Sequence, residues 1–417
     1  MNNKLKLAVA AALVAGASSA NAGIMIPAGD WTLDIGGVVN AYYTHTSFSG
    51  DDATAGEFGN GDSVNNITTG LLPNYLSVSG KTRQNDLDVG FTISINPGAS
   101  TRNAGIQGSQ QENRQAFLTF GDASWGSIKL GKDLGIYASD AILNDQTLLG
   151  VGSAAGSLAG NTTTLGRIGR GFMYADWKSQ VAYTSPNWNG FQFTAGVTQA
   201  WNALGNNGVG ANVAANVVGA DATGNGRGGS SPAFEGKASY AWTGDVSGKV
   251  WTSFISQKVE GLSAVQTAAT AAVALGDDRA TAYDIGAAVN VGAFGLVGYY
   301  GRGDGIGQTV QLARGFDRFG KSRDSDQWYV QGSFTVPGAG TKLAASYGES
   351  TLDGNSVDGF SDITADMWTV GAYHPITKHL NLVAEYSVAE DETNNRGAVA
   401  DTDVKAKTIS LGAILFF

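Results

Sequence analysis

The stretch that decides the fold reads Asn113-Arg114-Gln115-Ala116-Phe117-Leu118-Thr119-Phe120, then Gly121-Asp122-Ala123-Ser124-Trp125-Gly126, then Ser127-Ile128-Lys129-Leu130-Gly131-Lys132. The first and third parts are strand-like and the middle part is typical of a tight turn, so the stretch predicts a β-hairpin. A segment of more than forty residues without a clear strand pattern follows, up to about Trp177. A loop of that length is either functional or evidence of a wrong assignment. We interpret it as functional.

The first 22 residues predict a secretory signal peptide. Lys4 and Lys6 form a short positive region, residues 7–17 are small and apolar, and Ala20-Asn21-Ala22 matches the small-x-small pattern of a cleavage site. The apolar part is too short to span a bilayer as a helix. We therefore expect an exported mature chain of residues 23–417 that forms one domain.

Composition narrows the class of protein. The chain has no Cys, so neither a disulfide framework nor a thiolate metal site is available. Its net charge of -10 argues against nucleic acid as a partner, because nucleic acid needs a basic surface. Mean hydropathy is near zero and no apolar run of about twenty residues follows the signal. Two classes remain: a soluble exported β-protein, and a membrane barrel whose strands alternate between apolar outward and polar inward residues.

Strand-like alternation recurs along the chain. Between residues 87 and 96, for example, apolar residues at every odd position alternate with polar or small ones. Tight turns and long loops alternate strictly between the strands, and an Ala-rich loop at 260–279 is compatible with a short helix. The predicted strands are residues 31–45, 72–80, 87–96, 113–120, 127–132, 181–184, 191–198, 234–242, 246–257, 283–291, 294–301, 327–336, 342–347, 367–374, 380–388 and 408–417.

Sixteen antiparallel strands with short turns at one rim and long loops at the other predict an all-β transmembrane barrel of the outer-membrane type. Closure removes edge strands and satisfies every backbone group in lipid. Aromatic residues recur at strand ends, as in interfacial girdles, whereas in a soluble sandwich they would form the core. These residues are Trp31, Tyr42, Phe48, Phe234, Trp242, Trp328, Phe334, Trp368, Tyr373 and Phe416.

Three segments resemble the general (diffusion) porins of Gram-negative bacteria, which are sixteen-stranded trimeric outer-membrane channels. Residues 114–120 followed by 126–132 resemble the family's R-x-A-F-x-G-L … G-x-(x)-x-L-G-R. Val181-Ala182-Tyr183-Thr184-Ser185-Pro186-Asn187 is similar to V-x-Y-x-S-P-N, and residues 410–417 are similar to the terminal strand that ends in Phe. The resemblance covers essentially the whole chain.

The resemblance implies a passive channel for ions and small hydrophilic solutes in the outer membrane of a Gram-negative bacterium, reached after Sec export. It also implies a homotrimer in outer-membrane lipid and recognition of Phe417 by the barrel assembly machinery. The third outer loop, about 133–177, is expected to fold into the lumen with its acids facing basic residues on the wall. The expected constriction residues are Arg114, Lys132, Asp133, Asp140, Asp145, Arg167 and Arg170.

The chain departs from the family at two places. Ala182 and Thr184 occupy positions where many relatives place a basic residue. The second strand has Tyr75 and Leu76 in place of an early arginine, although basic residues follow. The basic side of the constriction is therefore expected to be thin, and the acidic balance of the chain suggests a mild cation preference.

Other interpretations stand beside these. The loop acids could be solvated surface residues, Arg114 could make a structural wall contact, and the two loop arginines could pair with the acids or pin the far end of the loop. A substrate-selective channel would keep the same fold. A surface adhesin would use the long loops, where Arg302-Gly303-Asp304 is a candidate of low specificity. The three histidines lie far apart and no Ser/His/Asp set is apparent, so we predict no enzyme, cofactor or metal site.

Overall fold

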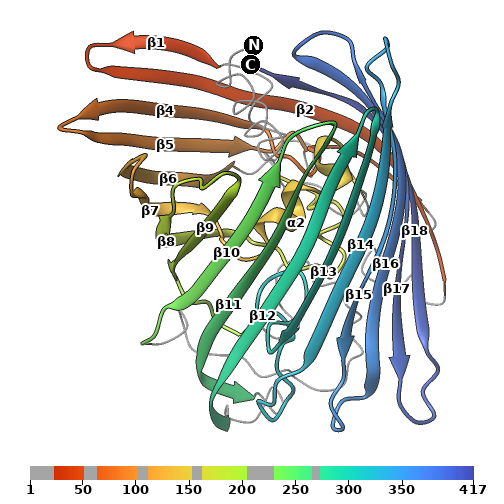
Figure 1. Cartoon of the computed structure of the whole chain (residues 1–417). Coiled ribbons are helices and arrows are strands. Elements are labelled where there is room, and N and C mark those ends of the chain that lie inside the picture. Colours follow the sequence, from red (N-terminus) through yellow and green to blue (C-terminus); the bar gives the residue numbers. More distant parts are fainter. Residues whose placement is uncertain (1–22, 51–62, 101–110, 153–161, 204–229, 265–272) are drawn as a thin grey trace, which may run out of the picture.

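A computed structural model describes residues 23–50, 63–100, 111–152, 162–203, 230–264 and 273–417, and the predicted signal peptide lies outside them. The strands are β1 (Ile24–Ala28), β2 (Trp31–Ser49), β3 (Ser63–Thr68), β4 (Tyr75–Gln84), β5 (Leu87–Pro97), β6 (Gln111–Asp122), β7 (Gly126–Leu134), β8 (Trp177–Thr184), β9 (Phe191–Thr198), β10 (Ala233–Trp242), β11 (Val246–Ala264), β12 (Val273–Val291), β13 (Phe294–Asp304), β14 (Asp324–Thr335), β15 (Lys342–Asp353), β16 (Phe360–Pro375), β17 (Leu380–Asn395) and β18 (Thr402–Phe416). Figure 1 shows that they curve into a barrel.

The barrel is a closed ring of sixteen antiparallel strands, β2 and β4–β18, as predicted. The ring closes where β18 pairs with β2, from Lys405 opposite Ser49 to Phe416 opposite Val38. Phe417 continues this seam, because its carbonyl accepts the Gly37 N–H at 2.8 Å and its own N–H donates to the Gly37 carbonyl at 3.1 Å. The strands β1 and β3 pair with β2 in addition to the ring.

All sixteen predicted strands are present, and many extend further toward the long loops than predicted. β11 and β12 are the extreme case, since they pair as far as Ala264 and Val273, inside the segment predicted to be an Ala-rich loop or short helix. β3 also lies in a segment predicted as loop. Apolar alternation ends where the lipid ends, whereas the backbone ladder continues into solvent. Hydropathy therefore underestimates strand length at this rim.

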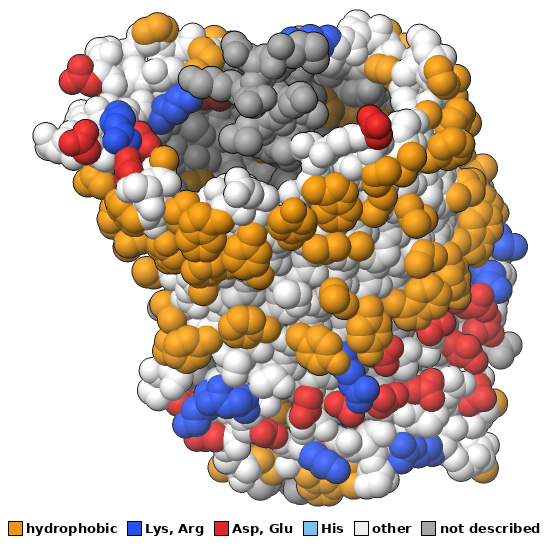
Figure 2. All heavy atoms as spheres, in the orientation of Figure 1, with side chains coloured by type: hydrophobic (Ala, Val, Ile, Leu, Met, Phe, Trp, Pro, Cys, Tyr) orange, Lys and Arg blue, Asp and Glu red, His pale blue; other side chains and the backbone are white. Residues whose placement is uncertain are grey.

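The outer face of the barrel is apolar. Ile93, Leu118, Val330 and Leu411 project from four different strands and are 46–55% exposed. Figure 2 shows hydrophobic side chains of this kind gathered in a belt across the face of the barrel in view, with charged side chains beyond it. Lipid contact requires such a belt.

No helix in the described parts of the chain is long and apolar enough to cross a membrane.

The prediction of aromatic girdles is correct for some residues and wrong for others. Phe234 and Trp368 are exposed, at 51% and 37%. Tyr42 and Tyr373 instead are buried, because they belong to the opposite phase of their strands. The Tyr42 hydroxyl donates to the Leu149 carbonyl at 2.8 Å. These inward aromatic residues support a loop inside the barrel.

Candidate functional site

The loop between β7 and β8 (residues 135–176), here called L3, folds into the barrel. L3 carries the short helix α2 (Ser139–Leu143) and the 3-10 helix η1 (Gln146–Leu149). Its side chains form three buried clusters with inward residues of the wall. Its described polar groups bond β2, β6, β10, β11 and β14–β17. The predicted bounds of 133–177 agree to within two residues, and Asp133 belongs to the end of β7.

Glu235 of β10 anchors the start of L3. Its carboxylate accepts the backbone N–H groups of Ile136 at 2.8 Å and Tyr137 at 2.9 Å. It also accepts the Lys178 ammonium at 2.6 Å and the Thr198 hydroxyl at 2.7 Å. The side chains of Lys178 and Glu235 are completely buried. Removing one member of such a pair leaves an uncompensated charge, which makes the anchor energetically important.

Glu385 of β17 anchors the middle of L3 in the same manner. It accepts the N–H groups of Val151 at 2.7 Å and Gly152 at 3.0 Å. The Tyr373 hydroxyl donates to its second oxygen at 2.6 Å. Within the described residues this carboxylate has no cation at ion-pair distance. Two wall carboxylates therefore each hold a pair of consecutive L3 amides.

Asp140 of α2 meets two lysines of the barrel wall. Lys237 of β10 lies 3.4 Å from its carboxylate, and Lys249 of β11 forms a second ion pair with it. Burial favours a higher pKa for Asp140, but the two ammonium groups outweigh burial and hold the pKa below its ordinary value. A loop acid thus faces wall cations, as the resemblance implies. The cations come from β10 and β11, and not from Arg114 or Lys132.

Asp145 has a mainly structural position at the start of η1. Its Oδ1 accepts the Thr147 N–H at 2.9 Å, which caps the helix. Burial raises the pKa of Asp145 above its ordinary value, and neither the nearby Arg167 guanidinium nor the hydrogen bond to Thr147 fully offsets this. Asp145 is therefore not the solvated surface acid of the alternative interpretation.

Arg167 and Arg170 fix the second half of L3 to the wall. Arg167 is fully buried and donates to the Met367 carbonyl at 2.7 Å and to Ser346 Oγ at 2.6 Å. Arg170 is also buried and forms an ion pair with Asp391 of β17. Arg167 also lies near Asp145, so it both pins the loop to the wall and lies beside an acid of the same loop. Arg170 pairs with the wall alone among these contacts.

We expect Arg167→Met to lower the free energy of unfolding by about 3 kcal/mol, because it removes two hydrogen bonds from a charged donor. Urea unfolding in lipid vesicles, followed by Trp fluorescence, measures the change. Arg396→Met is the matched control, since Arg396 also donates to a carbonyl, that of Gly354 at 2.9 Å, but is exposed. Equal losses in the two variants would contradict the role of burial.

Arg114 links β6 to L3. Its guanidinium is buried and donates to the Glu112 carboxylate at 2.7 Å and to Thr162 Oγ1, in L3, at 3.0 Å. It also lies over the Trp177 ring at 5.5 Å. These contacts fit the structural alternative for Arg114.

Asp133 and Lys132 lie on opposite faces of β7. Asp133 is buried inside the wall, where it accepts the Gln115 amide at 2.9 Å and the Lys129 ammonium. Lys132 pairs with Ala116, which is in phase with the exposed Leu118, and it donates to a backbone carbonyl at 2.8 Å. The prediction that Lys132 lines the lumen is therefore wrong, because strand alternation turns it outward.

A second segment packs against L3. The Tyr174 N–H donates to the Thr309 carbonyl at 2.9 Å, and the Gly171 N–H donates to Thr309 Oγ1 at 3.0 Å. Gln311 donates to the Tyr174 carbonyl at 3.2 Å. The loop between β13 and β14, predicted as a charged loop, thus folds inward onto L3.

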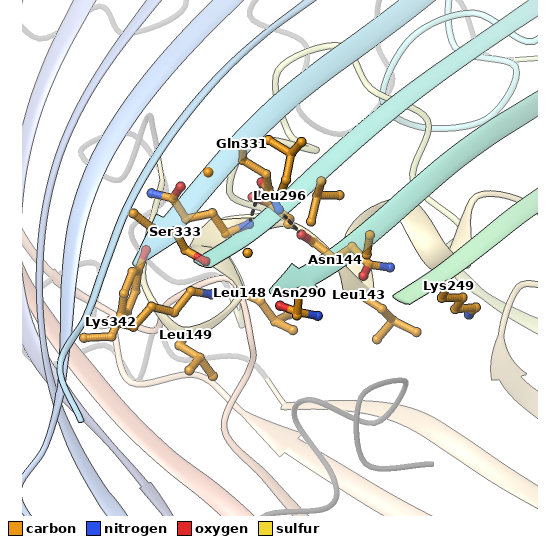
Figure 3. Close-up of a pocket in the computed structure, with 18 of the residues that line it drawn as sticks. Leu143, Asn144, Leu148, Leu149, Lys249, Asn290, Leu296, Gln331, Ser333 and Lys342 are labelled. Atoms are coloured by element: carbon orange, nitrogen blue, oxygen red, sulfur yellow. Dashed lines mark hydrogen bonds between the residues drawn. The ribbon is translucent and has the colours of Figure 1, made fainter. Parts of the chain in front are cut away.

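On the short-turn side of L3, a cavity of about 230 Å³ remains between the loop and the wall of β11–β16. Gln331 joins the two, since its amide donates to the Asn144 carbonyl and its Oε1 accepts the Gln146 N–H at 3.0 Å. Figure 3 shows the lining side chains, which include Lys249, Asn290, Ser333 and Lys342 from the wall and Leu143, Leu148 and Leu149 from L3.

The comparisons with known proteins agree with this architecture. The profile of the Gram-negative porin family matches residues 8–395. This chain belongs to the Gram-negative porin family. It is an outer-membrane diffusion channel. The search of curated proteins returned no match.

Solved structures of other outer-membrane proteins share the fold of this porin. The outer membrane channel DcaP of Acinetobacter baumannii has 13% identity and a TM-score of 0.61 over 95% of this chain and 100% of that chain. An anion-selective porin from Comamonas acidovorans has 14% identity and a TM-score of 0.57 over 93% and 100%. The trimer form of OmpT from Vibrio cholerae has 15% identity and a TM-score of 0.54 over 93% and 99%.

Six charged wall residues that hold L3 in this porin are absent from the predicted site: Lys178, Glu235, Lys237, Lys249, Glu385 and Asp391. A usable pattern was present, because Glu235 and Lys237 alternate with Phe234 and the outward residues of β10. A charge in the inward phase of an amphipathic strand is a candidate lumen residue. The backbone N–H groups of L3 that donate to Glu235 and Glu385 are not marked by any sequence pattern of this kind.

Proposed function

We propose that L3 forms the constriction of this porin, and that ions and small hydrophilic solutes pass through the lumen beside it. The observation that carries this proposal is the attachment of Asp140 to Lys237 and Lys249, which fastens α2 to the side of β10 and β11. At the wall of β2–β6, an opening of about 340 Å³ has a mixed lining, in which apolar residues such as Leu72, Tyr75 and Trp177 stand beside the polar residues Ser77, Ser79, Thr92, Asn96 and Gln115.

Conductance of the purified protein in planar bilayers tests the proposal directly. Stable ohmic steps are expected, because the path is lined by fixed polar groups and needs no binding event to open. Absence of any conductance from the folded protein would overturn the proposed path.

Asp140→Asn is expected to shift the selectivity toward anions, because it leaves Lys237 and Lys249 without their carboxylate. One charge acting through water on an ion roughly 8 Å away changes its energy by about 0.5 kcal/mol, with opposite sign for anion and cation. The anion-to-cation permeability ratio should therefore rise about fivefold at low ionic strength, where screening is weak. The reversal potential under a KCl gradient measures this ratio.

Asp245→Asn serves as the control for that measurement. Asp245 lies in the exposed turn between β10 and β11, so the substitution removes the same charge outside the lumen. The reversal potential of this variant should match that of the original protein. If Asp140→Asn also leaves the potential unchanged, the ion path does not pass α2.

We further propose a homotrimer in outer-membrane lipid, supported by the exposed apolar belt and by the fold shared with a protein solved as a trimer. The mass of the folded protein in detergent tests it. Recognition of Phe417 by the barrel assembly machinery is proposed on the same basis, since Phe417 closes the seam with Gly37. Deleting Phe417 should reduce the amount of folded barrel in the outer membrane.

The adhesin alternative receives less support. Arg302 and Asp304 lie in β13, where they pair with β12 and β14, and Arg302 lies 3.4 Å from Asp324. A tripeptide held in the ladder of a sheet is not presented on a free loop. Permeation therefore accounts for more of the described structure than surface adhesion does.

A further inference from the structure

Lys342 stands out among the inward cations of the barrel. Lys129, Lys178, Lys237 and Lys249 each form an ion pair with a carboxylate. Lys342 has no carboxylate at ion-pair distance among the described residues, and its ammonium lies 5.9 Å from the centre of the Tyr373 ring. In Figure 3 its side chain points into the cavity on the short-turn side of L3. This cation is available to a solute.

Two further polar groups converge on the same cavity. A Cβ placed on Gly295 would lie 2.7 Å from Ser333 Oγ and 2.9 Å from Asn290 Oδ1. Glycine at this position therefore keeps open a small space bounded by a hydroxyl and an amide. Within the described chain, neither side chain has a hydrogen-bond partner. The Ser333 hydroxyl can donate to an anion, whereas Asn290 presents its amide oxygen, which is an acceptor.

The charged side chains that line the cavity are Lys249, Lys342 and Asp145, and the Glu385 carboxylate lies behind Tyr373. Asp145 lines it, but the Arg167 guanidinium lies near that carboxylate. Asp140 is matched by Lys237 and Lys249, which together outnumber it. Lys342 adds a cation that has no carboxylate at ion-pair distance among the described residues and lies over the Tyr373 ring. An anion entering this cavity is therefore attracted, and a cation is repelled.

Part of the cavity lining is apolar. Leu143, Leu148 and Leu149 of L3 line it together with Tyr373. The volume of about 230 Å³ is smaller than the roughly 300–1,000 Å³ of drug-sized sites, so the occupant must be small. A solute with one charged end and a short hydrocarbon part matches a lining that offers both a cation and apolar side chains.

We propose that this cavity is a binding subsite for short-chain organic carboxylates, whose carboxylate contacts Lys342 and Ser333 and whose hydrocarbon part packs on the leucines of L3. The inference rests on the proposed function, because the solute reaches the cavity through the lumen. The porin would then retain such solutes during passage, in addition to passing unrelated small molecules.

Block of the single-channel current by butanoate tests the subsite, with butanamide as the neutral analogue of the same size. Butanoate should reduce the current in a saturable manner, and butanamide should not. Lys342→Gln should raise the apparent Kd of butanoate about tenfold, the loss expected when one charge-assisted hydrogen bond is removed. Lys342→Arg, which keeps the charge, should restore block to within about threefold of the original.

Two further variants separate the site from general effects. Lys258→Gln removes a lysine that is paired with Glu260 and Asp277 near the long-loop end of β11, and should leave the block unchanged. Gly295→Val keeps Lys342 but fills the space beside Ser333 and Asn290, and should weaken the block as well. The electrophoretic mobility shift on heating verifies that each variant is a folded barrel.

Equal butanoate block in the original protein and in folded Lys342→Gln would overturn the subsite, as would equal block by butanamide. Both results leave conduction intact and do not affect the proposed diffusion path. Absence of conductance in the original protein would instead overturn the proposed function. The experiment therefore distinguishes failure of the carboxylate subsite from failure of the proposed function.

Discussion

Replacing Glu235 with leucine is expected to lower the free energy of unfolding of the barrel by about 3–5 kcal/mol, the cost of breaking a buried ion pair from one side. The ammonium of Lys178 would remain buried without its carboxylate. The N–H groups of Ile136 and Tyr137 would lose their acceptor at the same time. Denaturant unfolding in lipid vesicles measures the change through the midpoint and slope of the transition.

The double variant Glu235→Leu with Lys178→Met tests the physical reason for that loss. It removes both charges, and replacing a buried pair by apolar residues is often nearly neutral. The remaining loss should then be about 2 kcal/mol, from the two unpaired amides of L3. A double variant as unstable as Glu235→Leu alone would show that the uncompensated charge is not the cause.

The alternation of inward and outward residues along a strand accounts for much of what the sequence predicts in this protein. The inward phase of β7 contains Lys129 and Asp133, and the outward phase contains Leu130 and Lys132. The phase of one apolar residue therefore fixes the faces of its neighbours, and Lys132 should have been excluded on this ground. The likeness of its position to a family arginine predicts a lumen residue, whereas the alternation predicts an outward one, and the structure agrees with the alternation.

The attachment of L3 is not predictable in that way. Glu385 and Val151 are separated by 234 positions in the chain, and their contact depends on the curvature of the closed barrel. Arg167 reaches Met367 across 200 positions. Every residue except proline has the same backbone N–H, so the identity of a loop residue does not indicate which wall group accepts its hydrogen bond. The sequence therefore predicts that a long loop enters the lumen, but not which wall residues hold it.

The distribution of these contacts explains how a loop without long helices keeps one conformation. Glu235 holds its start, Glu385 its middle and Arg167 its second half, on three different strands. Each contact places an ionised group against backbone groups, and such hydrogen bonds are stronger than neutral ones. A loop fixed at three points can narrow a pore without collapsing onto one wall.

Glu385→Ala should loosen L3 without unfolding the barrel. The amides of Val151 and Gly152 and the Tyr373 hydroxyl would lose their acceptor, at a local cost of about 2–4 kcal/mol. That cost raises the population of detached L3 roughly 30- to 1,000-fold. Single-channel recordings should therefore show frequent transient closures at voltages where the original channel stays open, while the denaturant midpoint changes little.

Gly150→Ala disturbs the same contact from the side of the loop. A Cβ on Gly150 would lie 2.0 Å from Glu385 Oε1, so the carboxylate must move away from its hydrogen-bond partners. Both single variants should show the same closures, and the double variant should add little, because one contact cannot be lost twice. Additive effects, or a quiet channel in Glu385→Ala, would show that L3 is held in the lumen without Glu385.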